Sequence, residues 1–245
     1  MADPSPPHQR VQLHRALSKL GWGSRQQAWD WIRAGEVRVD DRIVTDPLTW
    51  VDLGCQRITR AGCETAVERL SLALHKPRGI VTTRRDERGR RTVYDLLPPG
   101  LPWVFPVGRL DADSEGLLIL TNDSALAARL TEPEHQVPKT YHVGVKGCPS
   151  EEALSKLRTG VELADGRTRP TRVRLLRQGK KTGWLEIILT EGRNRQIRRM
   201  LAAVGHRVRQ SKRVAIGGYQ LGDLPMGACR PLSEADCRLL GQTAV

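Results

Sequence analysis

The stretch Gly108-Arg-Leu-Asp-Ala-Asp-Ser-Glu-Gly-Leu-Leu-Ile-Leu-Thr-Asn122 decides the arrangement of the larger part of this chain. Its second half, 117–121, is a short apolar run, which predicts a buried strand. Carboxylates at the mouth of a buried strand cost free energy unless they are solvated, paired or used. One basic and three acidic residues stand there: Arg109, Asp111, Asp113 and Glu115.

The spacing of these acids leaves several kinds of site to compare. Asp111, Asp113 and Glu115 imitate the start of a calcium loop, but the twelfth position is Asn122 and the tail is apolar, so we expect no calcium. Asp111 and Asp113 point to opposite faces if the backbone is extended, which disfavours a paired acid and base. From spacing alone, a surface ion pair between Arg109 and Asp111 that contributes little to stability is the favoured interpretation.

The overall charge points to a polyanionic partner. The chain has 245 residues, 39% of them apolar, and a formal net charge of +13. This excess makes nucleic acid the expected partner and is an argument about partners, not about fold. No apolar run approaches ~18 residues, so we expect no membrane-spanning helix. Residues 1–9, rich in proline and polar residues, are expected to form a flexible tail and lack the apolar core of a secretory signal.

The cysteines and histidines give no metal-binding pattern. None of the five cysteines forms a Cys-x-x-Cys pair or stands at a zinc-like spacing from histidine. We therefore expect reduced cysteines in a cytoplasmic protein and assign no metal site. The expected oligomeric state is a monomer.

Residues 11–44 predict a compact basic module. Apolar residues at helical spacing predict a helix that begins at Val11 and stops at Gly21. Ser24 begins a capping-box pattern for a second helix, which Gly35 ends. Two alternating strands about a tight turn follow in 37–44. The basic residues include Arg25 and Arg38. They indicate nucleic-acid binding, although a solvated helix pair is the alternative.

The rest of the chain predicts an α+β domain. Strands are expected at 70–75, 79–83, 117–121, 139–145, 172–176 and 183–190, and helices at 124–130, after Ser150, and after Asn194 as a possible cap. Strands and isolated helices without regular alternation favour a mixed, largely antiparallel sheet flanked by helices. We expect a small domain at 10–66, a boundary near 60–69, and a large domain at 70–243.

Two segments of the large domain carry an excess of arginine. The segment 84–91 is a loop with five arginines around Gly89, among them Arg84, Arg85 and Arg88. From Arg193 to Arg213 there are eight basic residues and no acid. Because a solvated helix face normally mixes charges of both signs, this run predicts a phosphate-facing surface.

Several motifs, in order, resemble the Rsu-type family of ribosomal pseudouridine synthases. The opening stretch matches the family signature Gly-Arg-Leu-Asp-x-x-Ser-x-Gly-Leu-Leu. Supporting motifs are Lys76-Pro-x-Gly79, Lys139-Thr-Tyr141, Glu191-Gly-Arg-Asn-Arg-Gln-Ile-Arg-Arg-Met200 and Ile216-Gly-Gly218. The module at 11–44 also resembles the small RNA-binding domain first named from ribosomal protein S-four. One departure is Arg213-Val-Ala215, where the family often has Arg-x-Arg.

The resemblance implies roles for individual residues. Asp111 would be the catalytic carboxylate, Tyr141 would stack on the target base, and Arg198 would pair with the aspartate. Arg109 would hold the flipped nucleotide or fill the space that it vacates. Phosphate and RNA contacts would come from both arginine-rich segments and from the small module: Arg84, Arg85, Arg88, Arg193, Asn194, Arg195, Gln196, Arg25 and Arg38.

The implied activity is the isomerisation of a uridine in ribosomal RNA, more specifically of the large subunit, to pseudouridine. The reaction needs no cofactor, and the implied partner is ribosomal RNA or a pre-ribosomal particle. Small-subunit ribosomal RNA and transfer RNA are alternative substrates. A non-catalytic RNA-binding protein of ribosome assembly is an alternative from another class.

Overall fold

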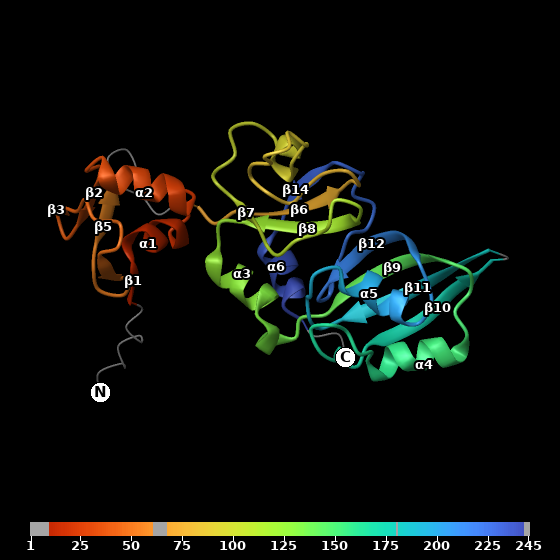
Figure 1. Cartoon of the computed structure of the whole chain (residues 1–245). Helices are drawn as coiled ribbons and strands as arrows, with labels where there is room; N and C mark the ends of the chain where they lie inside the picture. Colours follow the sequence, from red (N-terminus) through yellow and green to blue (C-terminus); the bar gives the residue numbers. More distant parts are fainter. Residues whose placement is uncertain (1–9, 61–67, 180, 243–245) are drawn as a thin grey trace. The chain divides into compact units, whose positions relative to one another are not determined.

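The computed structural model describes residues 10–60, 68–179 and 181–242, which fall into two compact units (Figure 1). The smaller unit contains the described residues up to Leu70, together with Gly100–Phe105 and Thr121–Ser124. The larger unit contains the remainder. The tail expected at 1–9 and most of the boundary expected near 60–69 lie outside the described residues.

The smaller unit combines two helices with two small sheets. Its helices are α1 (Leu13–Lys19) and α2 (Arg25–Arg33), and its strands are β1 (Arg10–Gln12), β2 (Val37–Val39), β3 (Arg42–Ile43), β4 (Trp50–Asp52) and β5 (Ile58–Arg60). Strand β1 pairs with β4, and β3-β2-β5 form a three-stranded sheet. Leu13, Leu17, Ile32 and Val37 belong to its buried core. The expected helix start at Val11 was wrong, because Val11 pairs with Val51 in an antiparallel ladder.

Two of its local motifs follow directly from sequence. The Ser24 side chain accepts a hydrogen bond from the Gln27 amide while the Gln27 side chain bonds back to Ser24, which confirms the predicted capping box of α2. In the β2–β3 hairpin, Asp40 and Asp41 both have positive φ, as a tight hairpin turn requires. Aspartate tolerates this region because its short side chain can bond locally; Asp40 accepts hydrogen bonds from Gln56 and the Arg57 amide.

The larger unit is built on one wide sheet. Its strands are β6 (Ser71–Lys76), β7 (Phe105–Pro106), β8 (Glu115–Thr121), β9 (Lys139–Lys146), β10 (Arg172–Gln178), β11 (Thr182–Leu189), β12 (Val208–Ile216), β13 (Tyr219–Gln220) and β14 (Cys229–Pro231). Its helices are η1 (Val93–Leu96), α3 (Ser124–Thr131), η2 (Pro133–His135), α4 (Glu151–Thr159), α5 (Gln196–Ala203) and α6 (Glu234–Leu240).

The strand order within the described residues is β10-β11-β9-β12-β8-β6-β14, with β13 on β12 and β7 on β8. The pairing of β12 with β8 is parallel, whereas β9 pairs antiparallel with both β11 and β12. Helix α4 packs against β10, and α5 packs against β12 (Figure 1). The expected mixed, largely antiparallel α+β fold is therefore confirmed. No helix in the described part of the chain has the length and hydropathy needed to cross a membrane.

Two expectations about strands were wrong. The segment 79–83 forms only an isolated bridge at Val81, because Gly79 has a φ of +86° and the Thr82 hydroxyl donates to the Leu110 carbonyl. The second concerns β12, which overlaps the end of the basic run 193–213 and was not predicted as a strand. Its basic residues alternate with buried ones, and Arg213 itself is buried, so the run is not one continuous phosphate-facing surface.

The glycine of the opening motif allows two strands to approach closely. Gly116 has a φ of +113°, and a Cβ on it would lie 2.2 Å from the carbonyl oxygen of Arg213. Arg213 is the parallel partner of Gly116 in the β12–β8 pairing. A side chain at this position would push β12 away from the start of β8. The motif therefore needs glycine for packing as well as for backbone conformation.

We predict that Gly116→Ala lowers the free energy of unfolding by at least about 3 kcal/mol, because strain and a backbone clash add. The matched control is Gly89→Ala. Gly89 also has a positive φ but has no neighbour within 4 Å of an added Cβ, so its expected cost is only about 1 kcal/mol. Chemical denaturation of both variants measures the difference, and equal losses would contradict the close-approach explanation.

Candidate active site

Asp111 lies on a tight turn that precedes β8. The Ser114 amide donates to the Asp111 carbonyl over 3.0 Å, so Ala112 and Asp113 form the tip of the turn. The segment 79–82 supports it from outside: the Gly79 amide donates to the Ala112 carbonyl over 2.7 Å. The expectation that Asp111 and Asp113 point to opposite faces applied to an extended backbone, and the backbone here forms a turn instead.

A completely buried lysine holds the same turn from inside. Lys76, the last residue of β6, has no exposed surface. Its ammonium group donates to the carbonyls of Pro77, Asp111 and Ser114 at 2.9, 3.1 and 2.8 Å. Three donors thus meet three acceptors, which is how a buried cation avoids an unpaired hydrogen. Burial lowers the pKa of Lys76 to about 8, against the opposing charges of Asp111 and Asp113.

Two arginines from the start of α5 converge on the turn. Arg195 donates to both carboxylate oxygens of Asp113 at 3.1 and 3.0 Å, and its nearer nitrogen lies 3.6 Å from the Asp111 carboxylate. Arg198 lies 3.1 Å from the Asp113 carboxylate and also donates to the Asp113 carbonyl. The ion pair of Arg198 is therefore with Asp113, and the arginine beside Asp111 is Arg195.

Asp113 is thus the anchor of both arginines. Burial raises its pKa, but the hydrogen bond from Arg195 and the charge of Arg198 outweigh that effect, so the pKa lies below its ordinary value. Arg195 also has a φ of +48° as the N-cap of α5, and no side chain caps this helix start. The expected cap, Asn194, was one residue too early.

A cavity of about 470 Å³ brings most of the predicted residues together. It is lined by Asp111, Tyr141, Arg198, Arg109, Arg193, Asn194, Arg195 and Gln196. Tyr141 reaches it from near the start of β9, where it also packs against the hydrophobic core. An adjoining cavity of about 600 Å³ shares Arg109, Asp111 and Arg195 and is lined by Arg85 and Arg88.

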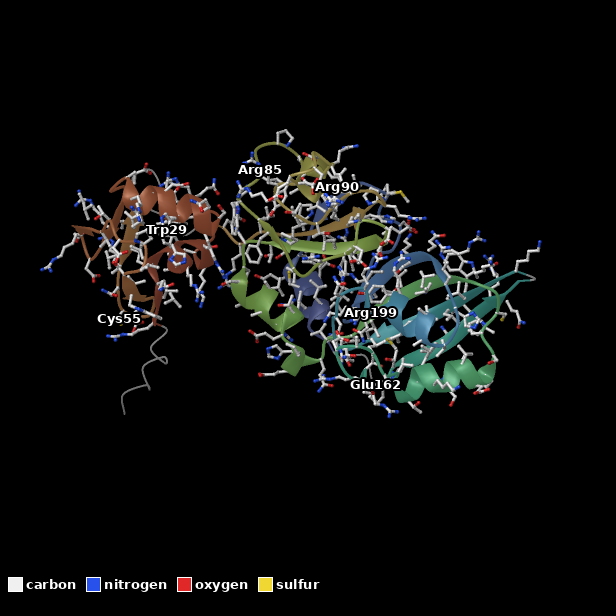
Figure 2. All side chains as sticks on the ribbon, in the orientation of Figure 1. Trp29, Cys55, Arg85, Arg90, Glu162 and Arg199 are labelled. Carbon is white, nitrogen blue, oxygen red and sulfur yellow. The ribbon has the colours of Figure 1, made fainter. Side chains whose placement is uncertain are left out.

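Some predicted contacts are already satisfied by the protein itself. Arg193 donates to the carbonyls of Asp165, Gly166 and Arg167, and it also pairs with Glu191. Figure 2 labels Arg85 and Arg90 in the loop after β6. Both residues line the second cavity, and Arg90 also pairs with Asp86. Arg199, labelled on α5 in Figure 2, bonds both oxygens of Asp165.

The remaining predicted residues are buried, or lie outside both cavities. Gln196 is buried and bonds Glu191 and the Arg193 amide, although its side chain borders the cavity. Arg84 lines neither cavity. Arg25 and Arg38 are exposed residues of the smaller unit.

Sequence reasoning assigned no role to three residues that the structure places at the site. Lys76 and Lys139 stood inside the quoted motifs, and Arg213 was counted only as part of the basic run. Lys139 and Arg213 line the first cavity. A usable signal was the period of two in β9, which puts Lys139 on the same face as Tyr141.

Comparison with known proteins agrees with this geometry. The family model for RNA pseudouridylate synthase matches residues 71–203, which include the turn, Tyr141 and the start of α5. The chain belongs to the RNA pseudouridylate synthase family. A model for the S4 domain matches residues 12–54, which confirms the expected small RNA-binding domain. The protein is therefore an RNA pseudouridine synthase, and it carries an S4 domain.

Individual relatives cover almost the whole chain. It is 36% identical over 232 residues to ribosomal large subunit pseudouridine synthase B of Bacillus subtilis (strain 168), covering 94% of this chain and 95% of that protein. It is 47% identical over 169 residues to ribosomal large subunit pseudouridine synthase E of Xanthomonas axonopodis pv. citri (strain 306), covering 62% and 87%. A crystal structure of a pseudouridylate synthase matches with 28% identity and a TM-score of 0.70, covering 94% and 99%.

We predict that the synthase loses activity above about pH 8, because the neutral amine of Lys76 has two hydrogens for three carbonyls. The charged, fully bonded form is present below the pKa and disappears as the pH rises through it. Because burial also lowers the pKa of Lys139 to about 8, the rate–pH profile is measured in Lys139→Arg, whose charge persists.

The control for this profile is Lys76→Met in the same background. This variant is expected to be slow at every pH and to show no alkaline fall. A profile of the Lys139→Arg enzyme that stays flat from about pH 7 to about pH 9.5 would mean that the ammonium of Lys76 does not maintain the turn.

Proposed function

We propose that this enzyme isomerises one specific uridine of large-subunit ribosomal RNA, with Asp111 as its catalytic carboxylate. The observation that carries the proposal is the convergence of Asp111, Tyr141 and Arg198 on one cavity from three distant parts of the chain. The choice of large-subunit RNA is supported by the names of two relatives, the Bacillus and Xanthomonas enzymes.

The surroundings of Asp111 suit a carboxylate that acts on the sugar. The carboxylate is partly exposed, at 27%, and a guanidinium nitrogen of Arg195 lies 3.6 Å from it. Lys76 and the Ser114 amide both donate hydrogen bonds to the Asp111 carbonyl. These bonds fix the backbone from which the carboxylate side chain extends. Such preorganisation lowers the cost of reaching a reactive geometry.

Tyr141 and Arg198 take different parts in this proposal. The Tyr141 ring offers a flat face on which an extruded uracil stacks, a contact that contributes about 1–3 kcal/mol for an aromatic residue. Arg198 acts through the turn, because it bonds both the carboxylate and the carbonyl of Asp113. We therefore describe Arg198 as a positioning residue for Asp111.

The adjoining cavity supplies contacts for the RNA strand. Extruding a uridine from its stack costs a few kcal/mol, and phosphate contacts must offset that cost. Arg85, Arg88 and Arg109 line the second cavity beside Asp111. We assign them to phosphates that flank the target nucleotide. Because Arg193 is engaged by the loop 165–167, we assign it to holding the pocket wall instead.

The S4 domain is assigned to a more distant part of the RNA. Its exposed Arg25 and Arg38 are suited to phosphate contacts. We further propose that the enzyme works as a monomer in the cytoplasm on ribosomal RNA or a pre-ribosomal particle. Three described cysteines, Cys55, Cys148 and Cys229, are free thiols, which is in keeping with a reducing compartment.

We predict that Asp111→Asn abolishes tritium release from ribosomal RNA labelled at carbon five of uridine, because the amide cannot act as a nucleophile or a base. RNA affinity is expected to stay within about threefold, since Asp111 is not a phosphate contact. The matched control, Asp223→Asn, changes an exposed aspartate outside both cavities.

Mapping pseudouridines in ribosomal RNA from cells with and without the gene identifies the substrate. A single large-subunit position that disappears with the gene supports the proposal. Loss of a small-subunit or transfer-RNA position would replace the proposed substrate. Tritium release that survives Asp111→Asn would remove Asp111 from its catalytic role, and unchanged binding without any release would favour a non-catalytic RNA-binding protein.

We predict that Arg25→Gln with Arg38→Gln weakens RNA binding and lowers the slope of log affinity against log salt by about 0.9 for each phosphate that the protein no longer neutralises. The rate at saturating RNA should not change, because both residues belong to the unit that lacks Asp111. Arg174→Gln, on β10 of the larger unit, is the control. An unchanged salt slope would exclude these two arginines from the RNA interface.

A further inference from the structure

Two cations stand beside Tyr141 without an acidic partner among the described residues: Arg213 is buried and Lys139 is half-buried. Lys139 lies two residues before Tyr141 on β9, so both side chains lie on the same face of the strand. Arg213 is the direct cross-strand partner of Tyr141 in the antiparallel β9–β12 pairing. Directly opposed residues have Cβ atoms about 4.5–5.5 Å apart. All three side chains line the 470 Å³ cavity.

Part of the Arg213 guanidinium group has no hydrogen-bond acceptor among the described residues. Only 4% of Arg213 is exposed. Its Nε donates to the Leu117 carbonyl over 2.7 Å, but its Nη2 is buried and finds no hydrogen-bond acceptor among the described residues. Burying a cationic donor without an acceptor costs free energy, so this arrangement requires an explanation.

Lys139 adds a second positive charge to the same cavity. Burial, followed by repulsion from Arg213, lowers its pKa to about 8. No carboxylate in the described ranges 10–60, 68–179 and 181–242 forms an ion pair with Lys139. The three acids that border the cavity have other neighbours: Asp111 lies beside Arg195, Glu191 bonds Arg193 and Gln196, and Glu132 lies 3.3 Å from His135. The two cations therefore face the cavity without a counter-ion.

We propose that Lys139 and Arg213 stabilise the negative charge that develops on the uracil ring when it leaves the sugar. This inference rests on the proposed function. It adds two catalytic residues to Asp111 and Tyr141, and it assigns them to the base, not to the sugar or the phosphate.

The isomerisation passes through a negatively charged uracil ring, which a nearby positive charge would stabilise. When the bond between C1′ and N1 breaks, the electron pair stays with the ring and spreads over N1 and the carbonyl oxygens O2 and O4. Asp111 compensates the electron-poor sugar meanwhile, either by bonding to C1′ or by removing a sugar proton, and that bond breaks or that proton returns when C5 attacks C1′. The ring's electron pair forms the new bond between C5 and C1′. C5 then releases its proton and N1 takes one up, so the isomerised base is neutral. The ring is therefore anionic from the breaking of the first bond until the formation of the second. Fixed positive charges in a buried cavity stabilise a developing anion far more strongly than water does.

The position of the pair favours the base over a phosphate. Arg213 is almost wholly buried and lies beside the ring on which we stack the uracil. A phosphate of the extruded nucleotide remains connected to the strand and stays near the mouth of the cavity. Exposed arginines are available there; Arg195, for example, is 45% exposed.

Two variants and two controls test the pair in single-turnover reactions. Lys139→Met and Arg213→Met are each expected to slow isomerisation by about 100-fold, with RNA affinity changed less than about threefold. Lys139→Arg retains the charge and should recover most of the rate. Lys146→Met changes an exposed lysine of the same strand and should behave as wild type. Thermal unfolding of each variant verifies that it is folded.

A better leaving group provides the decisive comparison. In RNA with 4-thiouridine at the target, sulfur helps the ring to carry negative charge, so the enzyme depends less on the two cations. The loss caused by Lys139→Met should then be at least about fivefold smaller than with uridine. Equal losses on both substrates, or losses that appear only as weaker RNA binding, would overturn the inference and indicate a phosphate contact.

A binding experiment gives an answer that does not depend on activity. Barbiturate is a uracil-like ring that is anionic at neutral pH, and it should bind the RNA-free protein at least about tenfold more tightly than uracil. Ligand-observed NMR measures both, and Lys139→Met should remove the preference. Equal binding, no binding, or a preference that persists in the variant would overturn the inference. An inactive wild-type enzyme would instead overturn the proposed function, and this comparison would still decide about the pair.

Discussion

The buried ammonium group of Lys76 is the interaction on which the site depends. It joins the end of β6 to both sides of the turn before β8, through the carbonyls of Asp111 and Ser114. A buried charge is tolerated only when its hydrogen-bonding capacity is satisfied, and here every hydrogen of the ammonium has an acceptor. The carboxylate of Asp111 is therefore positioned through its own main chain, which leaves its side chain available.

Charge is distributed around this turn in two layers. Asp113 attracts Arg195 and Arg198 toward the outer side, where solvent still reaches the ion pairs. Arg213 is buried and Lys139 half-buried, and neither forms an ion pair with an acid among the described residues. The cavity is negative at Asp111 and positive at Lys139 and Arg213. This arrangement suits a reaction in which the sugar becomes electron-poor and the ring electron-rich.

Much of the fold could be predicted because local signals were strong. The capping box at Ser24, the apolar run of β8 and the alternation of β9 each depend on residues close in sequence. The segment 79–83 and β12 were missed because their conformations depend on distant partners: Thr82 bonds Leu110, and β12 is fixed by β8 and β9. Basic residues in β12 also concealed its alternation.

The residues of the site were predicted less completely for a similar reason. Motif resemblance indicated Asp111, Tyr141 and Arg198, and the geometry brings them to one cavity. It could not show that Arg198 pairs with Asp113, or that Arg193 is occupied by main-chain carbonyls, because those contacts depend on turn geometry. Burial distinguishes Arg213 from the exposed arginines of the same run, and burial is a property of the folded sheet.

The close approach of Gly116 and Arg213 also has a consequence for synthesis of the chain. Gly116, near the start of β8, is synthesised almost one hundred residues before Arg213, its partner in β12. Contacts so far apart form late, after long loops have closed. A nascent chain that already carries Asp111 and Tyr141 therefore has an unfinished cavity. The enzyme becomes able to act on RNA only after the last strands of its sheet have left the ribosome.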